Sequence, residues 1–259
     1  MSFAPFAITQ LSEHDRANIY PYEAPATDYV IEQGQCRPFA EDDKKELAGR
    51  VAVLSVGSNR APQQLIRKFG QEARCFVSAV TLHDCDIIHS ACFSYYGAVP
   101  CTAHPSLGTS IQLNAIWLTS DELQIMHDTE AVGTAYDFCV WDKGAVEFHN
   151  VDSPDAIYGY SSRLGALCDE AGLPFALAKL PASARRFSAA SQIEARQKLY
   201  HKLPVGLRAS DEAQFMQKLV SDRGFRKQVN DTLLRQAQPM KQGRWQIISA
   251  TTDKADAYL

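Results

Sequence analysis

The chain has 259 residues, of which 46% are hydrophobic and 22% are charged, and this ordinary globular balance excludes a disordered, collagen-like or coiled-coil chain. The mean hydropathy is −0.24, and no apolar run approaches the roughly 20 residues that a membrane helix needs, which excludes a membrane-spanning protein. The net charge of −4 disfavours nucleic acid as a partner of the chain as a whole.

The charge is divided unevenly along the chain. Residues 1–180 hold 12 lysines and arginines against 23 aspartates and glutamates, whereas residues 181–259 hold 14 against 7. Such asymmetry marks either an arm that binds nucleic acid or a basic helical tail lying on an acidic body, and we favour the tail. The predicted parts are an N-terminal wrap (1–49), a core (50–180) and a basic helical extension packed on the core (181–259).

The cysteines and the first residues bear on the compartment. The seven cysteines are odd in number and form no Cys-x-x-Cys pair, which is typical of free, mostly buried thiols in the reducing cytosol. Residues 1–6 show no basic region followed by an apolar stretch, so they do not resemble a secretory signal. The expected localisation is cytoplasmic. The sequence carries no signal for an oligomeric state.

The first half of the chain is predicted to pass from irregular structure into strands. Residues 1–49 are polar and proline-containing, which favours an irregular wrap with one short helix at 40–48. Val51–Val56 is apolar and β-branched, which indicates a buried strand, and a helix follows from Pro62 to the stop at Gly70. Further strands are predicted at 76–82, 85–89, 92–96 and 110–118.

The second half mixes helices with two more strands. Thr119–Glu122 has the sequence of a capping box, which predicts a helix through Leu123 and Met126 that stops near Gly133. Strands at 136–141 and 146–148, a helix at 161–171 and two amphipathic helices beyond residue 187 complete the prediction. This order of elements favours an α+β fold with one main sheet.

The first candidate for a binding site is the turn Gly57-Ser58-Asn59 between the first predicted strand and helix. A glycine lets the backbone approach a ligand closely, and free N–H groups at a helix start attract carboxylates and phosphates. The turn lacks the spacing of a Walker loop or of a dinucleotide fingerprint. A ligand-binding loop and a plain tight turn therefore both remain open.

The second candidate is Glu130. The residues Leu123, Met126, His127 and Glu130 follow the spacing i, i+3, i+4, i+7, so the carboxylate is expected on the apolar stripe of its helix. A carboxylate that is desolvated in this way suits a general base. The alternative is that Glu130 lies at a fraying helix end and meets water.

Together, these two features resemble the γ-glutamylcyclotransferase family. The family loop reads Tyr-Gly-Ser-Asn after the first strand, where this chain has Val56-Gly57-Ser58-Asn59. The family's catalytic glutamate closes a strand–helix segment similar to residues 110–123 and His127–Glu130, and an aromatic residue follows at Tyr136. Residues 172–178 and 185–187 are similar to downstream segments of some bacterial-type members. The resemblance covers roughly residues 50–200.

The resemblance implies a fold, a reaction and a set of site residues. The fold is a small mixed β-barrel with packed helices, and the reaction is attack of the α-amine of a γ-glutamyl group on its own side-chain carbonyl, which releases 5-oxoproline and a free amine. The resemblance makes Glu130 the general acid/base. It makes a small-molecule γ-glutamyl compound the substrate, with no cofactor and no membrane partner. The substrate-binding residues would be Val56, Gly57, Ser58, Asn59 and Tyr136.

The chain departs from the family pattern in two places. Val56 replaces the usual tyrosine, and Ala131 follows the glutamate where glycine usually comes first. Either change is compatible with altered substrate choice or with a cavity that binds a ligand without turnover. The expected function is therefore cyclisation of a γ-glutamyl group. The alternative is a non-catalytic small-ligand-binding or interaction protein on the same fold.

Other residues with chemical potential are interpreted as structural. On a strand, His83, Cys85 and His89 could share one face, but the chain lacks the paired ligands at fixed spacing that mark zinc sites, so no metal is expected. No Gly-x-Ser-x-Gly elbow surrounds Ser58 or the serines at 161–162, which disfavours a serine hydrolase.

Overall fold

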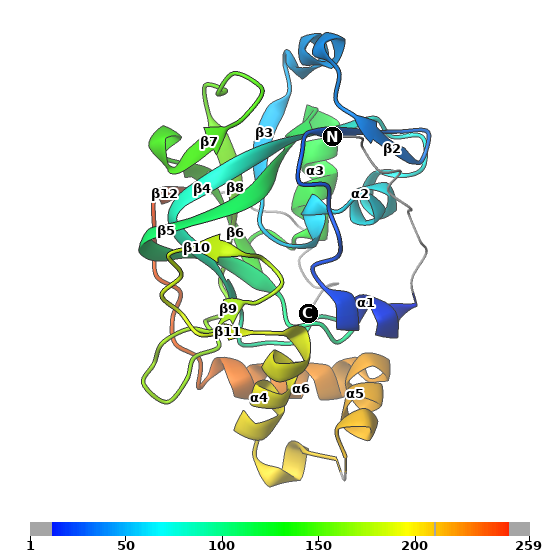
Figure 1. Ribbon diagram of the computed structural model, residues 1–259. Helices are drawn as coiled ribbons and strands as arrows, with labels where there is room; N and C mark the ends of the chain where they lie inside the picture. The colour runs from blue at the N-terminus through cyan, green and yellow to red at the C-terminus, as the bar shows by residue number, and fades with distance from the viewer. Residues whose placement is uncertain (1–11, 210, 249–259) are drawn as a thin grey trace.

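One large mixed sheet forms the centre of the protein, as the computed structural model of residues 12–209 and 211–248 shows (Figure 1). Its 12 strands are β1 (Tyr29–Glu32), β2 (Gln35–Pro38), β3 (Val51–Ser55), β4 (Cys75–His89), β5 (Cys101–Leu118), β6 (Tyr136–Trp141), β7 (Val146–Phe148), β8 (Ile157–Ser162), β9 (Ala176–Leu177), β10 (Ala182–Ser183), β11 (Ala189–Ala190) and β12 (Trp245–Ile248). The main path through the sheet runs β11-β9-β4-β5-β3-β8-β6-β12.

This sheet is open. Among the described strands, β11 and β12 end the path and do not pair with each other. The predicted α+β class is confirmed, but the closed β-barrel is not supported, because closure requires the two edge strands to pair.

Helices cover the sheet in two groups (Figure 1). The α-helices are α1 (Glu13–Ile19), α2 (Pro62–Phe69), α3 (Ser120–Thr129), α4 (Gln192–Lys202), α5 (Glu212–Ser221) and α6 (Arg223–Leu234), and the 3-10 turns are η1 (Glu41–Leu47), η2 (Ser58–Arg60), η3 (Lys143–Ala145) and η4 (Val205–Leu207). Helices α2 and α3 lie side by side near the upper end of the sheet, and α4, α5 and α6 gather at the lower end. No helix in the described part of the chain has the length and apolarity to cross a membrane.

The long hairpin of β4 and β5 is the spine of the sheet. The two strands pair from Phe76↔Trp117 to His89↔Cys101, with a shift of register between His83 and Cys85. This bulge explains why the sequence pattern divides β4 into two shorter strands, since an extra residue at a bulge breaks the alternation of side chains. The predicted strand at 92–96 is wrong, because these residues form the turns that connect β4 to β5.

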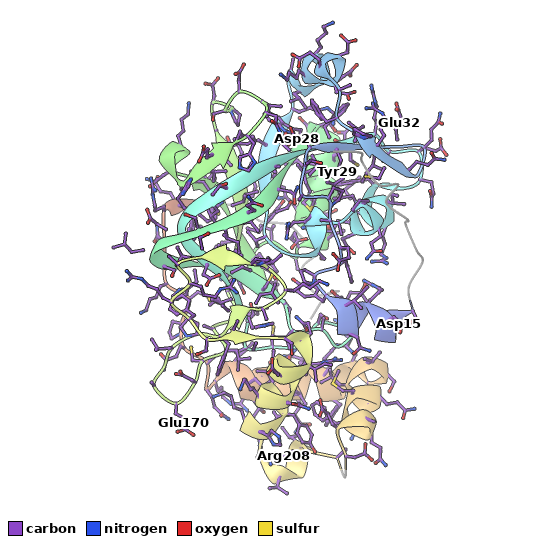
Figure 2. All side chains as sticks on the ribbon, in the orientation of Figure 1. Asp15, Asp28, Tyr29, Glu32, Glu170 and Arg208 are labelled. Carbon is purple, nitrogen blue, oxygen red and sulfur yellow. The ribbon has the colours of Figure 1, made fainter. Side chains whose placement is uncertain are left out.

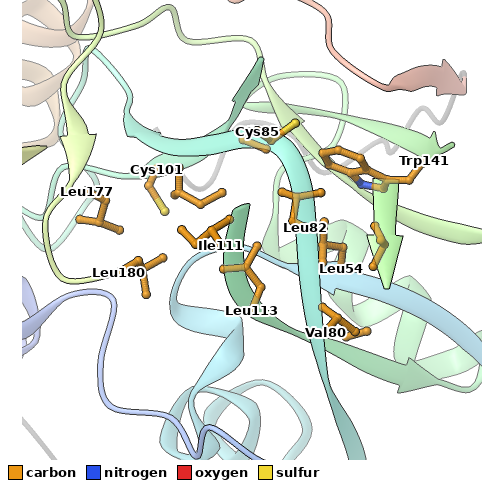
Figure 3. Close-up of a cluster of buried hydrophobic side chains, with 14 of the residues drawn as sticks. Leu54, Val80, Leu82, Cys85, Cys101, Ile111, Leu113, Trp141, Leu177 and Leu180 are labelled. Atoms are coloured by element: carbon orange, nitrogen blue, oxygen red, sulfur yellow. The ribbon is translucent and has the colours of Figure 1, made fainter. Parts of the chain in front are cut away.

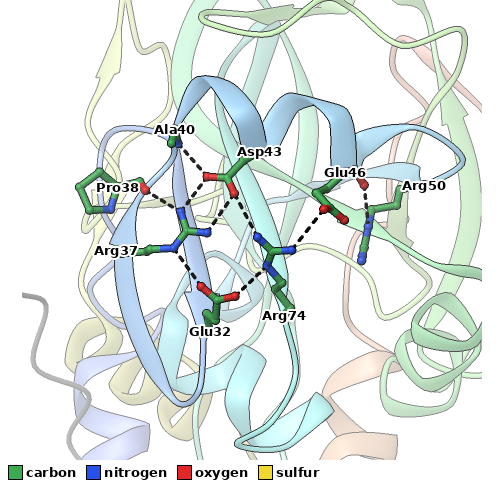
Figure 4. Close-up of polar contacts among 8 residues, drawn as sticks. All are labelled: Glu32, Arg37, Pro38, Ala40, Asp43, Glu46, Arg50 and Arg74. Atoms are coloured by element: carbon green, nitrogen blue, oxygen red, sulfur yellow. Dashed lines mark hydrogen bonds and ion pairs between the residues drawn. The ribbon is translucent and has the colours of Figure 1, made fainter.

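Residues 12–50 contain more regular structure than the predicted irregular wrap, whose residues 1–11 lie outside the described part of the chain. Strands β1 and β2 form a hairpin, and β1 also pairs with the start of β4, with Tyr29 opposite Val77. Figure 4 shows a charged network that fixes this hairpin: Asp43 accepts hydrogen bonds from Arg37 and Arg74. The β4 residues that pair with β1 lie more than 40 residues away, so the local sequence does not reveal this pairing.

Side chains from opposite faces of the same strands form two separate cores. Leu54 packs in the larger cluster shown in Figure 3, together with Leu82, Ile111 and Trp141. Its neighbour Val53 points the other way into a cluster to which α2 and α3 contribute Leu65, Ile66 and Met126. This second cluster holds α2 and α3 against the sheet, and it therefore positions the end of α3 beside the loop that follows β3.

The C-terminal part is helical, as predicted, but its elements differ in detail. Two amphipathic helices are predicted beyond residue 187, but the described residues form three, because Asp222 ends α5 and its side chain caps α6 through the N–H of Phe225. The predicted helix at 161–171 is wrong, since β8 extends to Ser162 and irregular structure follows. After α6 the chain returns to the sheet, where β12 pairs with β6.

Candidate functional site

A cavity of about 310 Å³ lies between the loop after β3, the end of α3, helices α1 and α2, and the turns at 92–101. We call it the Glu130 cavity. All six predicted site residues line it: Val56, Gly57, Ser58, Asn59, Glu130 and Tyr136. Residues that are 74 positions apart in the sequence thus meet at one surface, because β3 and β5 are neighbours in the sheet and lead into the loop and into α3.

The loop after β3 keeps its backbone donors available. Within residues 12–209 and 211–248, no backbone hydrogen bond is donated by Gly57, Ser58 or Asn59. Gly57 caps the 3-10 turn η2, which contains Ser58 and Asn59, and α2 begins only at Pro62. These N–H groups therefore belong to the start of a single 3-10 turn and do not open the α-helix as expected. Glycine is needed at position 57 because a Cβ there would lie 2.6 Å from the hydroxyl oxygen of Tyr20.

Glu130 lies at the end of α3 and faces polar partners. Its Oε1 accepts a hydrogen bond of 2.9 Å from Nδ2 of Asn59 and a second one from the ammonium of Lys68. The carboxylate is 16% exposed and Lys68 only 6%. Leu123 and Met126 do form an apolar stripe that packs in the cluster with α2, but the Glu130 carboxylate beside it is charge-paired by Lys68 instead of being surrounded by apolar groups alone.

The backbone after Glu130 has an unusual conformation. Ala131 adopts φ +49°, the left-handed region in which helices commonly end and which glycine favours. Ala131 is nevertheless buried, and its cluster includes Cys92, Ala135 and Leu164. The methyl group therefore fills space that the glycine usual in the γ-glutamylcyclotransferase family would leave empty.

The thiols and phenols of the cavity are uncharged. Burial raises the pKa of both Cys92 and Cys101 to about 12, so neither is a thiolate nucleophile near neutral pH. Burial also holds the pKa of Tyr136 and Tyr20 well above its usual range. These phenols can act only as neutral hydrogen-bonding groups.

The sequence analysis missed the three cationic residues of the cavity wall, Arg16, Arg67 and Lys68. Lys68 follows Leu65 by three positions on α2, so it lies on the buried face of the helix, and this spacing was a usable signal. Arg16 comes from α1, in a segment predicted to be irregular, and no local pattern indicated it. Together with Arg67 they give the described cavity lining three cationic side chains against one carboxylate, Glu130. The cavity therefore favours an anionic ligand, although residues 1–180 are acidic overall.

A second polar arrangement lies on the sheet outside the cavity. His83 contacts Ser110 Oγ at 3.1 Å and Glu147 Oε2 at 3.0 Å, in the order of a serine hydrolase relay. However, Ser110 lies within β5 between the paired strands β4 and β10, so this position offers no turn that would form an oxyanion hole. Among the described residues, no group of three potential metal ligands gathers at one point.

Comparisons with known proteins identify no relative: no protein-family model, no curated protein and no solved structure matches the chain.

Proposed function

We propose that the Glu130 cavity cyclises a γ-glutamyl amine, releasing 5-oxoproline and the free amine. The observation that supports this most is the meeting of the general acid/base candidate Glu130 with the Gly57–Asn59 loop, through the 2.9 Å hydrogen bond from Asn59. A γ-glutamyl group carries a carboxylate and an amine on one carbon, and both ends need partners of this kind.

In the proposed reaction, the loop and the base act on opposite ends of the glutamyl group. The N–H groups of Gly57, Ser58 and Asn59 bind the α-carboxylate, which fixes the α-amine against the γ-carbonyl, and such fixed orientation supplies much of the rate. The amine nitrogen attacks the γ-carbonyl carbon while Glu130 takes its proton. Glu130 then returns the proton to the leaving nitrogen as the carbon–nitrogen bond of the amide breaks.

Lys68 has a supporting part in this scheme. Its ammonium neutralises the charge of Glu130, so an incoming α-carboxylate meets no net repulsion from the acid/base. Together with Asn59, Lys68 also fixes the direction of the Glu130 carboxylate. We therefore assign Lys68 as a positioning residue.

A second candidate function is non-catalytic binding of a small anionic ligand. It is favoured by Val56, which replaces the tyrosine usual in the γ-glutamylcyclotransferase family, and by the ion pair, since the ammonium of Lys68 already occupies Oε1 of Glu130. The two functions differ in product, because only the first releases 5-oxoproline.

The test is to incubate the purified protein with a panel of γ-glutamyl amines and to measure 5-oxoproline. The α-glutamyl isomers serve as control compounds, because their side-chain carboxylate is not an amide and cannot release an amine by this route. Release from γ-glutamyl compounds only is expected. No release from any γ-glutamyl compound, together with measurable binding of them, would leave the binding function as the better proposal.

A further inference from the structure

Arg16 presents a buried cation to the Glu130 cavity from α1, a segment outside the region of family resemblance. The residue is only 6% exposed. Its Nε donates to the hydroxyl of Tyr22 at 3.3 Å and its Nη2 to the hydroxyl of Tyr95 at 3.1 Å, while the guanidinium carbon lies 4.3 Å from the ring centre of Tyr96. The side chain is thus fixed in place by neutral groups.

The positive charge of Arg16 has no counter-ion within the described chain. No carboxylate in residues 12–209 and 211–248 forms an ion pair with it, and its two hydrogen bonds use two of the five guanidinium N–H groups. Burial of a charge without an opposite charge is costly. Arg185 is the matched contrast: it holds the fully buried Asp86 through two hydrogen bonds of 2.8 and 2.9 Å.

Arg16 differs from the other buried arginines in its position at the cavity. Arg196 and Arg226 are equally buried, but neither lines the Glu130 cavity. Arg226 donates to the carbonyls of Leu219 and Val220, so its role lies in joining α5 to α6. Arg16 instead holds a planar guanidinium in the wall of a cavity large enough for a small ligand, and this fork suits bidentate binding of a carboxylate or phosphate.

We propose that Arg16 forms an anion subsite of the Glu130 cavity, which binds a negatively charged group carried by the amine part of the ligand. This inference rests on the proposed function, in which the α-carboxylate of the glutamyl group is bound by the Gly57–Asn59 loop. A γ-glutamyl group has no second carboxylate, so the anion at Arg16 belongs to the amine that leaves. The hydroxyl groups of Tyr22 and Tyr95 orient the guanidinium and leave three of its N–H groups for a ligand.

The experiment uses three γ-glutamyl conjugates of equal length, those of β-alanine, 2-aminoethylphosphonate and propylamine. Dissociation constants are measured by calorimetry with the full chain carrying Glu130→Gln, so that no conjugate is consumed. We expect the carboxylate or the phosphonate conjugate to bind about 10–100-fold more tightly than the propylamine conjugate, which is the range for charge-assisted hydrogen bonds. The tighter of the two identifies the anionic group that the subsite prefers.

Two further substitutions, each added to the Glu130→Gln protein, test whether Arg16 causes the preference for the anionic conjugates. Adding Arg16→Gln should reduce the preference to less than about 3-fold and leave the affinity for the propylamine conjugate unchanged. Tyr95→Phe keeps the charge but removes one oxygen that orients it, so an intermediate preference is expected. Circular dichroism melting curves of both variants verify that they are folded.

Three results would overturn the subsite. Equal affinity for the three conjugates would do so, as would binding of none of them. An equal loss of affinity for all three conjugates in Arg16→Gln would mean that Arg16 binds the α-carboxylate instead. The proposed function fails separately: a wild-type chain that prefers the anionic conjugates but releases no 5-oxoproline would refute cyclisation and keep the subsite.

Discussion

The wall of the Glu130 cavity contains the partly buried carboxylate of Glu130 and the buried guanidinium of Arg16, of which only Glu130 has an opposite charge beside it in the described part of the chain. Glu130 accepts hydrogen bonds from Lys68, which carries the opposite charge, and from Asn59. Among the same described residues, Arg16 contacts only phenol oxygens and the face of an aromatic ring. A paired charge needs no ligand and is held in one direction, which suits a group that moves a proton. An unpaired charge gains a partner only when a ligand enters, which suits recognition.

Some other buried ionisable groups in the protein avoid an isolated charge, either by ion pairing or by staying uncharged. Arg185 and Asp86 form an ion pair, and His89 remains neutral while its Nε2 contacts the carbonyl oxygen of Ala190 at 2.9 Å. Pairing, neutralisation and an unpaired charge therefore occur in one molecule, and each predicts a different response to substitution or to pH.

The largest effect is expected when the proposed acid/base is removed. Glu130→Gln keeps the shape and the hydrogen-bonding capacity of the side chain, so affinity for a γ-glutamyl compound should persist, while the rate of 5-oxoproline release falls about 10²–10⁴-fold. Glu170→Gln is the control, because Glu170 is exposed and does not line the Glu130 cavity; Figure 2 shows it at the lower end of the molecule. Equal rates in the two variants would remove Glu130 from the mechanism.

Removal of a paired guanidinium should cost far more stability than removal of the unpaired one. Arg185→Gln leaves the carboxylate of Asp86 buried without a counter-ion, and we expect the free energy of unfolding to fall by about 3–5 kcal/mol. Arg16→Gln removes an uncompensated charge and should change it by less than about 1 kcal/mol. Urea unfolding measures both, and equal losses would show that Arg16 stabilises the fold instead of serving a ligand.

The pH dependence of the free energy of unfolding tests whether buried His89 is uncharged. Burial lowers the pKa of His89 to about 4, against about 6.5 in an unfolded chain. The unfolded state therefore binds the proton more readily, so stability is complete above pH 6.5 and decreases as the pH falls towards 4, by about 3 kcal/mol. His89→Gln keeps a donor for Ala190 and should show a shallower loss; an identical slope in the variant and the wild type would contradict this origin.

Lys68→Met tests how much the ion pair between Lys68 and Glu130 contributes to stability. The substitution leaves Glu130 partly buried with Asn59 as its remaining hydrogen-bond donor, and we expect a loss of about 2–4 kcal/mol in the free energy of unfolding, somewhat below that of a fully buried pair. The double variant with Glu130→Gln should recover most of that loss, because no uncompensated charge remains. If the double variant is as unstable as Lys68→Met, the ion pair is not the cause.

The smallest effect is expected at Ala131. Replacement by glycine relieves the left-handed backbone, worth about 1–2 kcal/mol, but removes a buried methyl group worth about 1 kcal/mol. The two changes nearly cancel, so Ala131→Gly should alter thermal stability by less than about 1 kcal/mol in either direction. A larger loss would mean that the methyl group packs more tightly than the conformation costs.

The sequence predicts best those parts whose signals are local. The strand Val51–Val56, the stop at Gly70 and the capping box at Thr119 all appear in the structure near their predicted positions. The approach of Glu130 to the loop is also present, although the spacing predicts an apolar environment for the carboxylate and the structure has an ion pair there. Periodicity indicates on which face of a helix a residue lies, but it does not predict which side chain of another element contacts that face.

The parts that the sequence analysis missed depend on distant partners. Strand β1 is recognisable only through its pairing with β4, and Arg16 reaches the cavity only because α1 packs near α4, with Asn18 bound to Arg196. The open sheet has the same origin, because whether the edge strands meet is decided by the curvature of the whole sheet. Tertiary contacts of this kind leave no periodic trace in a short segment.

A crystal structure of the Glu130→Gln protein with the γ-glutamyl conjugate of β-alanine would test the central claim most directly. The account predicts that the α-carboxylate lies within hydrogen-bond distance of the N–H groups of Gly57–Asn59 and the α-amine beside the side chain at position 130. The second carboxylate should lie on the guanidinium of Arg16. A conjugate bound outside the Glu130 cavity, or bound inside it with its α-amine turned away from position 130, would contradict the account.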